Sequence, residues 1–354
     1  MKIYKEVFNR IISPENLFAA WDSFKSDKRK KLDVQAFEQH LEQNIFQLHR
    51  DLRAKTYRHG AYTGFYIRDP KQRHIHKALV RDRILHHAIF SIINPIFEPT
   101  FIATSFSCRV GYGSHKGVAV LESMLRRSTR NYTRLCFALK CDIKKFFDSV
   151  DHEVLLEILK RRIKDPDTIW LLERIITSFG PRRRERERDG GPRLECGIPI
   201  GNLTSQLFAN IYMNEFDQFV KHDLRVENYV RYTDDFVMLA ESRDCLDGLL
   251  SRTNEFLQTR LKLTLHPKKI EVRTAYQGVD FLGYVIFPRH RLLRTKTRQR
   301  VFKKLQKRSE DQRSGKISAD TFKQSLKSYL GVLSHADAHE LSKKIRNQFG
   351  IFGK

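Results

Sequence analysis

Residues 229–240 read Tyr-Val-Arg-Tyr-Thr-Asp-Asp-Phe-Val-Met-Leu-Ala. Two runs of β-forming residues flank a Thr-Asp-Asp centre, which predicts two antiparallel strands joined by a tight turn. The turn would present two adjacent carboxylates, Asp234 and Asp235. Adjacent carboxylates repel each other when partly enclosed, and a hard divalent cation is the commonest reason to keep them together. A polar hairpin turn without any ligand is the simpler alternative.

A third carboxylate lies upstream. Residues 138–141, Ala-Leu-Lys-Cys, predict a short strand that delivers Asp142, and two phenylalanines follow at 146 and 147. Three carboxylates of this kind could hold two Mg²⁺ ions about 3.5–4 Å apart, with Mn²⁺ as the alternative ion. Thr233, between Tyr232 and the acidic pair, is β-branched and suits the end of a strand.

A third segment lies between these two motifs. Residues 197–212, Gly-Ile-Pro-Ile-Gly-Asn-Leu-Thr-Ser-Gln-Leu-Phe-Ala-Asn-Ile-Tyr, predict a Gly-rich entry into an amphipathic helix. The order of Asp142, this segment, the Tyr-x-Asp-Asp box and Phe-Leu-Gly-Tyr at 281–284 resembles the reverse transcriptases, from about Arg68 to the C-terminus. The resemblance implies an α+β class: a right-hand polymerase fold with fingers, a palm of antiparallel sheet with helices, and a helical thumb.

The resemblance also implies a domain order. Residues 1–60 would form an N-terminal helical segment, residues 61–288 the interleaved fingers and palm, and residues 289–354 a basic helical thumb. Helical periodicity between residues 14 and 57 agrees with the first of these parts.

The middle segment narrows the resemblance. Residues 200–201 read Ile-Gly and 205–206 read Ser-Gln, where group II intron enzymes and their relatives usually carry Gln-Gly and Ser-Pro. This pairing, the block 201–210 and residues 334–339 resemble the reverse transcriptases of diversity-generating retroelements. One departure is Thr233, where Met or Ala is usual. The implied function is an RNA-directed DNA polymerase that makes mutagenic, adenine-directed cDNA from a template-repeat RNA by two-metal nucleotidyl transfer.

Two other functions stay open. A retron, group II intron-derived or abortive-infection reverse transcriptase would share the same polymerase chemistry. A non-catalytic RNA-binding scaffold would share the fold alone, because fold does not establish activity.

The resemblance assigns site residues in four groups. The catalytic residues are Asp142, Asp234, Asp235 and Lys269; the metal site comprises Asp142, Ile143, Asp234 and Asp235; the nucleotide-binding residues are Lys71, Arg73, Phe147, Ile200, Gly201 and Gln206; the template- and primer-binding residues are Arg109, Phe281, Leu282 and Gly283. Lys269 would protonate the departing pyrophosphate, although an exposed turn lysine is the more frequent case. The Phe147 ring would exclude a 2′-hydroxyl, while Phe146 points into the core.

Several basic segments have two readings. Residues 65–76 predict two short strands joined by a basic turn, in which Lys71 and Arg73 suit triphosphate oxygens. Arg81 and Arg83 fit either helix-surface charges or template-backbone ligands. The Gly-rich loop at 105–115 fits either a template contact or a plain turn. The alternating charges of residues 182–191 predict a solvated surface loop.

Composition indicates a polyanionic partner. The chain has 66 lysines and arginines against 41 acidic residues, a net charge of +25. Residues 289–354 contain 18 of these cations and 5 acidic residues. Three helices are predicted there, around 297–307, 318–333 and 336–349, with Ser318 as the N-cap of the second. The apolar residues of the second helix form a packing stripe: Phe322, Leu326, Tyr329, Leu330 and Leu333.

The expected partners follow from the charge and the resemblance. They are a structured template RNA, the cDNA product, dNTPs and a small basic accessory variability protein that forms a ring. Apolar runs near twenty residues are missing, so no membrane partner is expected. Five cysteines without CxxC spacing predict free thiols in a reducing cytoplasm. The resemblance implies a bacterial or phage-encoded protein. His335 and His339 have a helical spacing that fits packing and capping better than a metal site.

Overall fold

The computed structural model describes residues 2–68, 71–180 and 196–349, so the predicted loop at 182–191 lies outside the described residues. The chain divides into two compact units, each assembled from three separate stretches. The first unit comprises Met1–Cys108, Ile143–Arg225 and Arg252–His266; the second comprises Arg109–Asp142, Val226–Ser251 and Pro267–Lys354. The predicted division at residues 60 and 288 stays a prediction.

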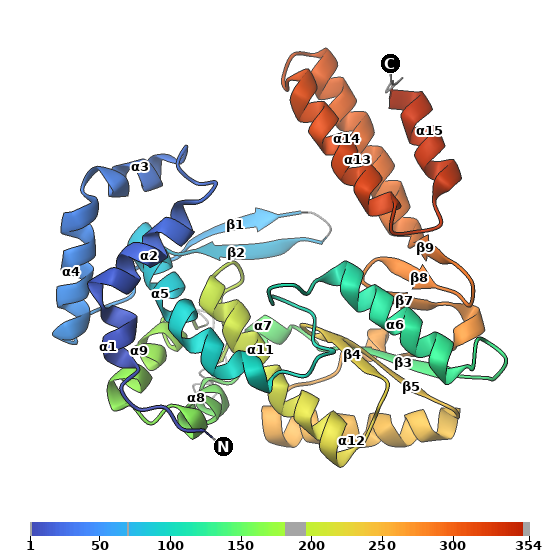
Figure 1. The fold of residues 1–354 in the computed structure, drawn as a ribbon, viewed down its shortest axis with the longest axis horizontal. Helices are drawn as coiled ribbons and strands as arrows, with labels where there is room; N and C mark the ends of the chain where they lie inside the picture. The colour runs from blue at the N-terminus through green and yellow to red at the C-terminus, as the bar shows by residue number, and fades with distance from the viewer. Residues whose placement is uncertain (1, 69–70, 181–195, 350–354) are drawn as a thin grey trace, which may run out of the picture. The chain divides into compact units, whose positions relative to one another are not determined.

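The first unit is mainly helical (Figure 1). Its central helix α5 (Val80–Phe97) packs against α2 (Pro14–Lys25) and α11 (Leu203–Gln218). Ten of the eighteen residues of α5 are buried and only Ser91 and Pro95 are exposed, so the helix is enclosed on most sides. The remaining helices are α1 (Phe8–Ile12), α3 (Leu32–Gln39), α4 (Leu41–Arg53), α7 (Phe146–Ser149), α8 (His152–Arg162) and α9 (Pro166–Ile176), with short turns η1 (Glu98–Thr100) and η2 (Phe219–Asp223).

The prediction that α11 is amphipathic is wrong. Most of its side chains are buried, polar ones included, so the helix lies inside the unit instead of on its surface. The buried polar groups have partners, as burial requires. The Asn210 amide donates to the Ser107 carbonyl at 2.8 Å, and the Tyr212 hydroxyl donates to the Leu261 carbonyl at 2.7 Å.

A two-stranded hairpin completes the first unit. Strands β1 (Thr63–Ile67) and β2 (Arg73–Lys77) pair antiparallel, with Ile67 opposite Arg73. The two predicted strands are therefore confirmed. Every residue of β1 is exposed, including Phe65 and Tyr66.

The second unit contains a four-stranded antiparallel sheet in the order β4-β5-β3-β6. Its strands are β3 (Phe137–Asp142), β4 (Tyr229–Tyr232), β5 (Asp235–Ala240) and β6 (Glu271–Thr274). Helix α6 (Ser114–Ser128) packs against β4 and β5. The strands predicted on both sides of Asp234 and before Asp142 are confirmed. Helix α12 (Arg243–Leu261) follows β5 and passes from the second unit into the first.

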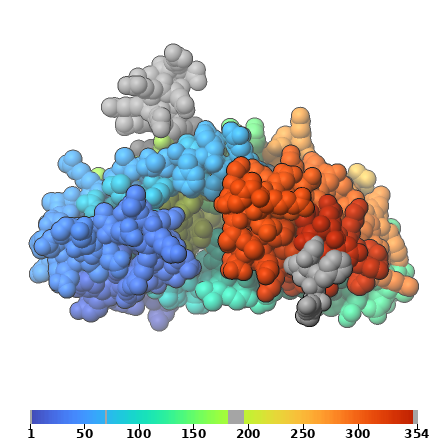
Figure 2. Space-filling model, turned by 90° about the horizontal axis from the view of Figure 1, so that it is seen from above, coloured from blue at the N-terminus to red at the C-terminus, as the bar shows by residue number. Residues whose placement is uncertain are grey.

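The rest of the second unit is a small sheet and a helical bundle. Strands β7 (Val279–Phe281), β8 (Tyr284–Ile286) and β9 (Arg291–Leu293) form an antiparallel sheet, and turns η3 (Pro267–Lys269) and η4 (Ala275–Gln277) precede it. Helices α13 (Thr295–Arg313), α14 (Ala319–Leu333) and α15 (His339–Phe349) follow. The surface of these helices, coloured orange to red, is visible in Figure 2.

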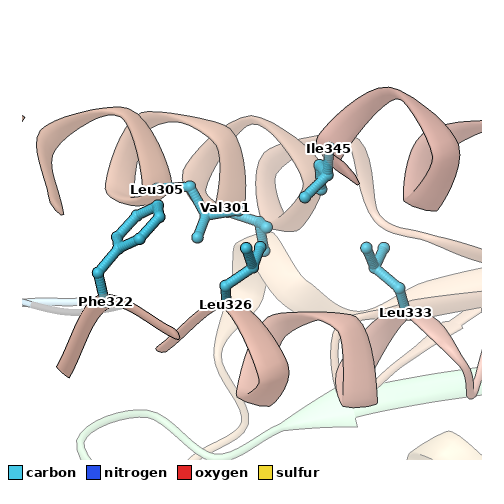
Figure 3. Close-up of a cluster of buried hydrophobic side chains, with 6 residues drawn as sticks. All are labelled: Val301, Leu305, Phe322, Leu326, Leu333 and Ile345. Atoms are coloured by element: carbon cyan, nitrogen blue, oxygen red, sulfur yellow. The ribbon is translucent and has the colours of Figure 1, made fainter. Parts of the chain in front are cut away.

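The three predicted C-terminal helices are confirmed together with their packing. Figure 3 shows the buried side chains that join them, which are Val301, Leu305, Phe322, Leu326, Leu333 and Ile345. The Ser318 hydroxyl accepts from the Thr321 N–H at 3.2 Å and caps α14, as predicted. The apolar stripe of α14 is thus used for packing within the bundle.

Candidate active site

The acidic pair lies at the turn of the β4–β5 hairpin. Tyr232 pairs with Asp235, which leaves Thr233 and Asp234 as the two turn residues. Thr233 has φ +57°, so the expectation that it ends a strand is wrong: it adopts the left-handed conformation that a two-residue hairpin turn demands. The buried Arg231 side chain donates to the Thr233 carbonyl at 3.0 Å, and this hydrogen bond stabilises the turn.

Asp142 and Asp235 face each other across the sheet. They are direct partners in the β3–β5 ladder, where opposite side chains have Cβ atoms about 4.5–5.5 Å apart. Burial raises the pKa of Asp235 to about 6, and the carboxylates of Asp142 and Asp234 add to this rise against the nearby Lys140. The hairpin and the ladder therefore concentrate negative charge at one end of the sheet.

Lys269 forms an ion pair with Asp142. Its ammonium lies 2.7 Å from both Asp142 oxygens, and its side chain is 38% exposed. The resemblance assigned Lys269 to the site, and the structure shows its ion pair with Asp142. Its predicted role as a proton donor stays a prediction.

The carboxylate set suits a divalent cation. Asp235 Oδ1 is buried and has no hydrogen-bond partner in the part of the chain that the structure describes. Carboxylate oxygens are the ligands that Mg²⁺ prefers, and an unsatisfied buried oxygen is the feature that a cation would correct. Within the described ranges no three His, Cys, Asp or Glu side chains form a ready-made metal cluster. Convergence of all three aspartates on shared ions stays a prediction.

Three charged residues beside the carboxylates were missed by the sequence analysis. Lys140 Nζ lies 3.2 Å from Asp280 Oδ1 and 4.0 Å from Asp235 Oδ2. Arg294 donates to the same Asp280 oxygen. Lys140 was detectable, because residues two apart on a strand share a face and Asp142 is two positions further on. Asp280 and Arg294 carry no local signal that links them to the site.

The predicted nucleotide-binding residues belong to the first unit, where hydrogen bonds fix one loop to the β1–β2 hairpin. The His76 N–H donates to the Ile200 carbonyl at 3.0 Å, and the Asn202 amide donates to the His76 carbonyl at 2.9 Å. Gly201 has φ +109°, and a Cβ there would lie 2.7 Å from Ile75 Cγ2. Only glycine fits this conformation and this approach.

Gln206 and Gly201 line a pocket of about 280 Å³ within the first unit. Its wall includes Lys77 and Arg83, which share the Asp33 carboxylate at 2.7 Å each. Arg81 lies 3.6 Å from Asp51 and donates to the Arg58 carbonyl. Both arginines of the 81–83 segment are therefore held by contacts within the fold, which favours the helix-surface reading over template binding.

The other predicted residues are placed as follows. Lys71 and Arg73 are exposed at the tip of the β1–β2 hairpin. Phe146 is buried, as predicted, and Phe147 is partly exposed. The side chain of Ile143 is buried, and its backbone bridges to Leu265. The roles assigned to these residues stay predictions.

The predicted primer-holding segment is a tight hairpin turn. Phe281 pairs with Tyr284, and Leu282 and Gly283 have φ +50° and +91°. Two successive positive φ values are typical of a type I′ turn. The predicted template residue Arg109 stacks its guanidinium 4.0 Å from the centre of the Tyr112 ring. Both features lie in the second unit.

The two C-terminal histidines do not pair with each other. The ring of His335 stacks on His115 with centroids 3.8 Å apart, and His339 is exposed at the start of α15. The ring contact of His335 agrees with the predicted packing role. All five cysteines are free thiols. In the described ranges no helix is long and apolar enough to span a bilayer.

Known proteins share this sequence pattern. Residues 68–286, more than half of the chain, match the family described as reverse transcriptase (RNA-dependent DNA polymerase). The chain is 27% identical over 256 residues to protein YkfC of Escherichia coli (strain K12), covering 62% of each protein. It is 20% identical over 353 residues to the group II intron-encoded protein LtrA of Lactococcus lactis subsp. cremoris, covering 80% of this chain and 57% of LtrA.

Two further similarities were found. The chain is 23% identical over 294 residues to nuclear intron maturase 1, mitochondrial, of Arabidopsis thaliana, covering 59% of this chain and 40% of that protein. A solved structure of telomerase from Candida albicans, in complex with a fragment of telomeric RNA, is 12% identical, with a TM-score of 0.48 over 74% of this chain and 50% of that chain. The chain spans less than two thirds of the length of these relatives.

Proposed function

This chain belongs to the reverse transcriptase family, and from that premise we propose that it copies RNA into DNA by nucleotidyl transfer at Asp142, Asp234 and Asp235. The predicted α+β class with a right-hand polymerase fold is confirmed by the same family match and by the mixed helices and sheets. The observation that supports catalysis best is the placement of Asp142 opposite Asp235, whose Oδ1 is buried without a partner.

Each group of site residues has a separate role in the proposed reaction. Mg²⁺ held by the three aspartates, with Ile143 beside them, would supply Lewis-acid stabilisation of charge on the reacting phosphate. Lys269 Nζ lies 2.7 Å from the Asp142 oxygens and its side chain is partly exposed, so it can turn towards a departing pyrophosphate and donate a proton. Lys71 and Arg73, exposed on the β1–β2 hairpin, would supply cations for the triphosphate, as the resemblance implies.

Primer extension tests this proposal. The purified chain should extend a DNA primer on an RNA template with Mg²⁺, and Asp234→Asn should lower the rate by at least about 100-fold, because a group that acts on charge in the transition state is lost. RNA binding by Asp234→Asn should match the wild type. Asp247→Asn, an exposed carboxylate on α12, is the matched control and should retain full activity.

Two results would contradict the proposal. Extension by Asp234→Asn at the wild-type rate would remove the carboxylates from the mechanism. Tight RNA binding without any extension by the wild type would favour the non-catalytic scaffold instead.

Within the family, we propose a reverse transcriptase of a diversity-generating retroelement, working with a structured RNA and a small basic accessory protein that forms a ring. Ile200-Gly201 and Ser205-Gln206 support this assignment. A group II intron-type reverse transcriptase is an equal second candidate, supported by the similarity to LtrA over 80% of this chain. A template repeat and a variable repeat beside the gene would favour the first candidate.

Misincorporation by Ile200→Gln separates the two candidates by chemistry. Ile200 provides no side-chain hydrogen bond, whereas glutamine at this place would restore an amide near the nucleotide. The wild type should misincorporate most often opposite template adenine, and Ile200→Gln should reduce that error several-fold, a difference that one hydrogen bond can produce. Sequencing of cDNA measures both rates. Equal error opposite A, C, G and U in the wild type would contradict the mutagenic function.

A further inference from the structure

One carboxylate oxygen in the second unit is shared by two cations from different elements. Asp280 Oδ1, on β7, accepts from Lys140 Nζ at 3.2 Å and from the guanidinium of Arg294. Lys140 lies on the catalytic strand β3, and Arg294 immediately precedes α13. All three side chains are largely enclosed, with exposed fractions of 16% for Lys140, 21% for Asp280 and 34% for Arg294.

Lys140 lies between two carboxylates and is closer to one of them. Its ammonium is 3.2 Å from Asp280 and 4.0 Å from Asp235 Oδ2. At the first distance it makes a charge-assisted hydrogen bond, and at the second it makes only a longer ionic contact. Asp280 therefore holds Lys140 at a distance at which its charge partly neutralises Asp235 without a direct hydrogen bond to that carboxylate.

The restraint matters because an ammonium and a divalent cation compete for the same oxygens. A lysine in direct contact with Asp235 would have to be displaced before a cation could bind, whereas a lysine bound by Asp280 would not. Without the Asp280 charge, Asp235 would be the nearest carboxylate that the structure gives Lys140, and the ammonium would move towards it.

We propose that Asp280 is a positioning residue that holds the Lys140 ammonium off Asp235 and so keeps that carboxylate available to a divalent cation. This inference rests on the proposed function, since it assigns Asp235 to cation binding. Asp280 acts through Lys140 and touches no substrate. The same oxygen fixes Arg294, whose N–H donates to the Gly283 carbonyl at 2.9 Å, so the network also joins the β7–β8 turn to the first helix of the bundle.

Mn²⁺ binding measured by electron paramagnetic resonance tests the inference without any reaction. Asp280→Asn should weaken Mn²⁺ binding by about 10-fold, because Lys140 then competes for Asp235. Lys140→Gln should bind Mn²⁺ at least as tightly as the wild type. The double variant should bind within about threefold of Lys140→Gln, which is the coupling expected when one residue acts through the other. Asp280→Glu, which keeps the charge, should stay near the wild type.

Thermal unfolding of each variant shows whether weaker Mn²⁺ binding comes from a loss of structure. Asp247→Asn is the charge-matched control. A double variant as weak as Asp280→Asn would overturn the inference, because Asp280 would then act independently of Lys140. If Asp280→Asn does not fold, the Lys140→Gln variant is the remaining test. Mn²⁺ binding by Lys140→Gln that is more than about threefold weaker than in the wild type would overturn the inference.

The two proposals fail in different ways. Wild-type protein that neither binds Mn²⁺ nor extends a primer would refute the proposed function. Wild-type protein that does both, with Asp280→Asn unchanged in Mn²⁺ affinity, would refute the positioning role alone.

Discussion

Thr233 adopts a backbone conformation that a β-branched residue rarely takes, with φ +57° in the turn that presents Asp234. A left-handed conformation costs an L-residue roughly 1–2 kcal/mol, and branching at Cβ adds crowding. The turn is nevertheless maintained by the β4–β5 ladder on both sides and by the hydrogen bond from Arg231 to the Thr233 carbonyl. The strain thus lies beside Asp234, one of the three carboxylates of the proposed chemistry.

Replacement of Thr233 by asparagine should relieve this strain. Asn tolerates the left-handed region better than Thr, so Thr233→Asn should raise the free energy of unfolding by about 0.5–1 kcal/mol. Urea denaturation without divalent cations measures the change. Thr177→Asn, at φ −77° after α9, is the control and should not stabilise the protein. A loss of stability in Thr233→Asn would mean that contacts of the Thr233 side chain outweigh the strain.

Local sequence patterns predicted single residues well where the cause is local. Ser318 was identified as a helix cap from its neighbours, and the core position of Phe146 was expected from the family resemblance at the next residue, Phe147. The left-handed Thr233 was missed because its φ is imposed by the length of the turn, not by its own preference. The Asp280–Lys140 contact was missed because 140 residues separate its partners.

At the scale of elements, α5 and α11 are joined by a buried histidine. His86 on α5 is 1% exposed; its Nδ1 lies 2.5 Å from the Thr204 hydroxyl on α11, and its Nε2 lies 3.2 Å from His59 Nε2. Burial lowers the pKa of His86 to about 3, and burial also lowers the pKa of His59 and His87. In the contact between the two rings one nitrogen donates and the other accepts, which two neutral imidazoles can do, and burial favours the neutral form of both.

Acid should therefore weaken the first unit through His86. The unfolded chain binds a proton near pH 6.5 and the folded chain only near pH 3, so this stability is present above pH 6.5 and is lost as the pH falls below it. Between pH 7.5 and pH 5 the loss should be about 2 kcal/mol. His86→Gln, which cannot titrate, should show a fall smaller by about that amount in urea denaturation. His339→Gln, on an exposed residue, is the control. An equal fall in His86→Gln and wild type would contradict the prediction.

Element types were predictable and their surroundings were not. Runs of β-forming residues predicted β4 and β5, and helical spacing with a cap predicted α13 to α15, because these patterns are set within a few residues. The environment of α11 was predicted wrongly, since its polar residues suggested a solvated face. In the structure these groups find partners in distant segments, such as Ser107 and Leu261. Burial of polar groups depends on tertiary contacts that one segment cannot reveal.

At the scale of the whole molecule, the charge of +25 is distributed unevenly along the chain. Residues 289–354 contribute an excess of 13 positive charges in fewer than a fifth of the residues. The apolar side chains of α13 to α15 pack inside their bundle, so many lysines and arginines of these helices remain exposed. A dense cationic surface of this kind binds a polyanion mainly by release of counterions.

Salt dependence of RNA binding tests whether this bundle meets the nucleic acid. Lys303 and Lys307 are exposed on one side of α13, four residues apart. If both contact phosphates of a single strand, the double variant Lys303→Gln/Lys307→Gln should reduce the slope of log K against log[salt] by about 1.4. Lys160→Gln/Lys164→Gln removes the same charge from the first unit and should leave the slope near the wild-type value. Equal slopes for both double variants would mean that the RNA senses the net charge of the chain and not a particular face of the bundle.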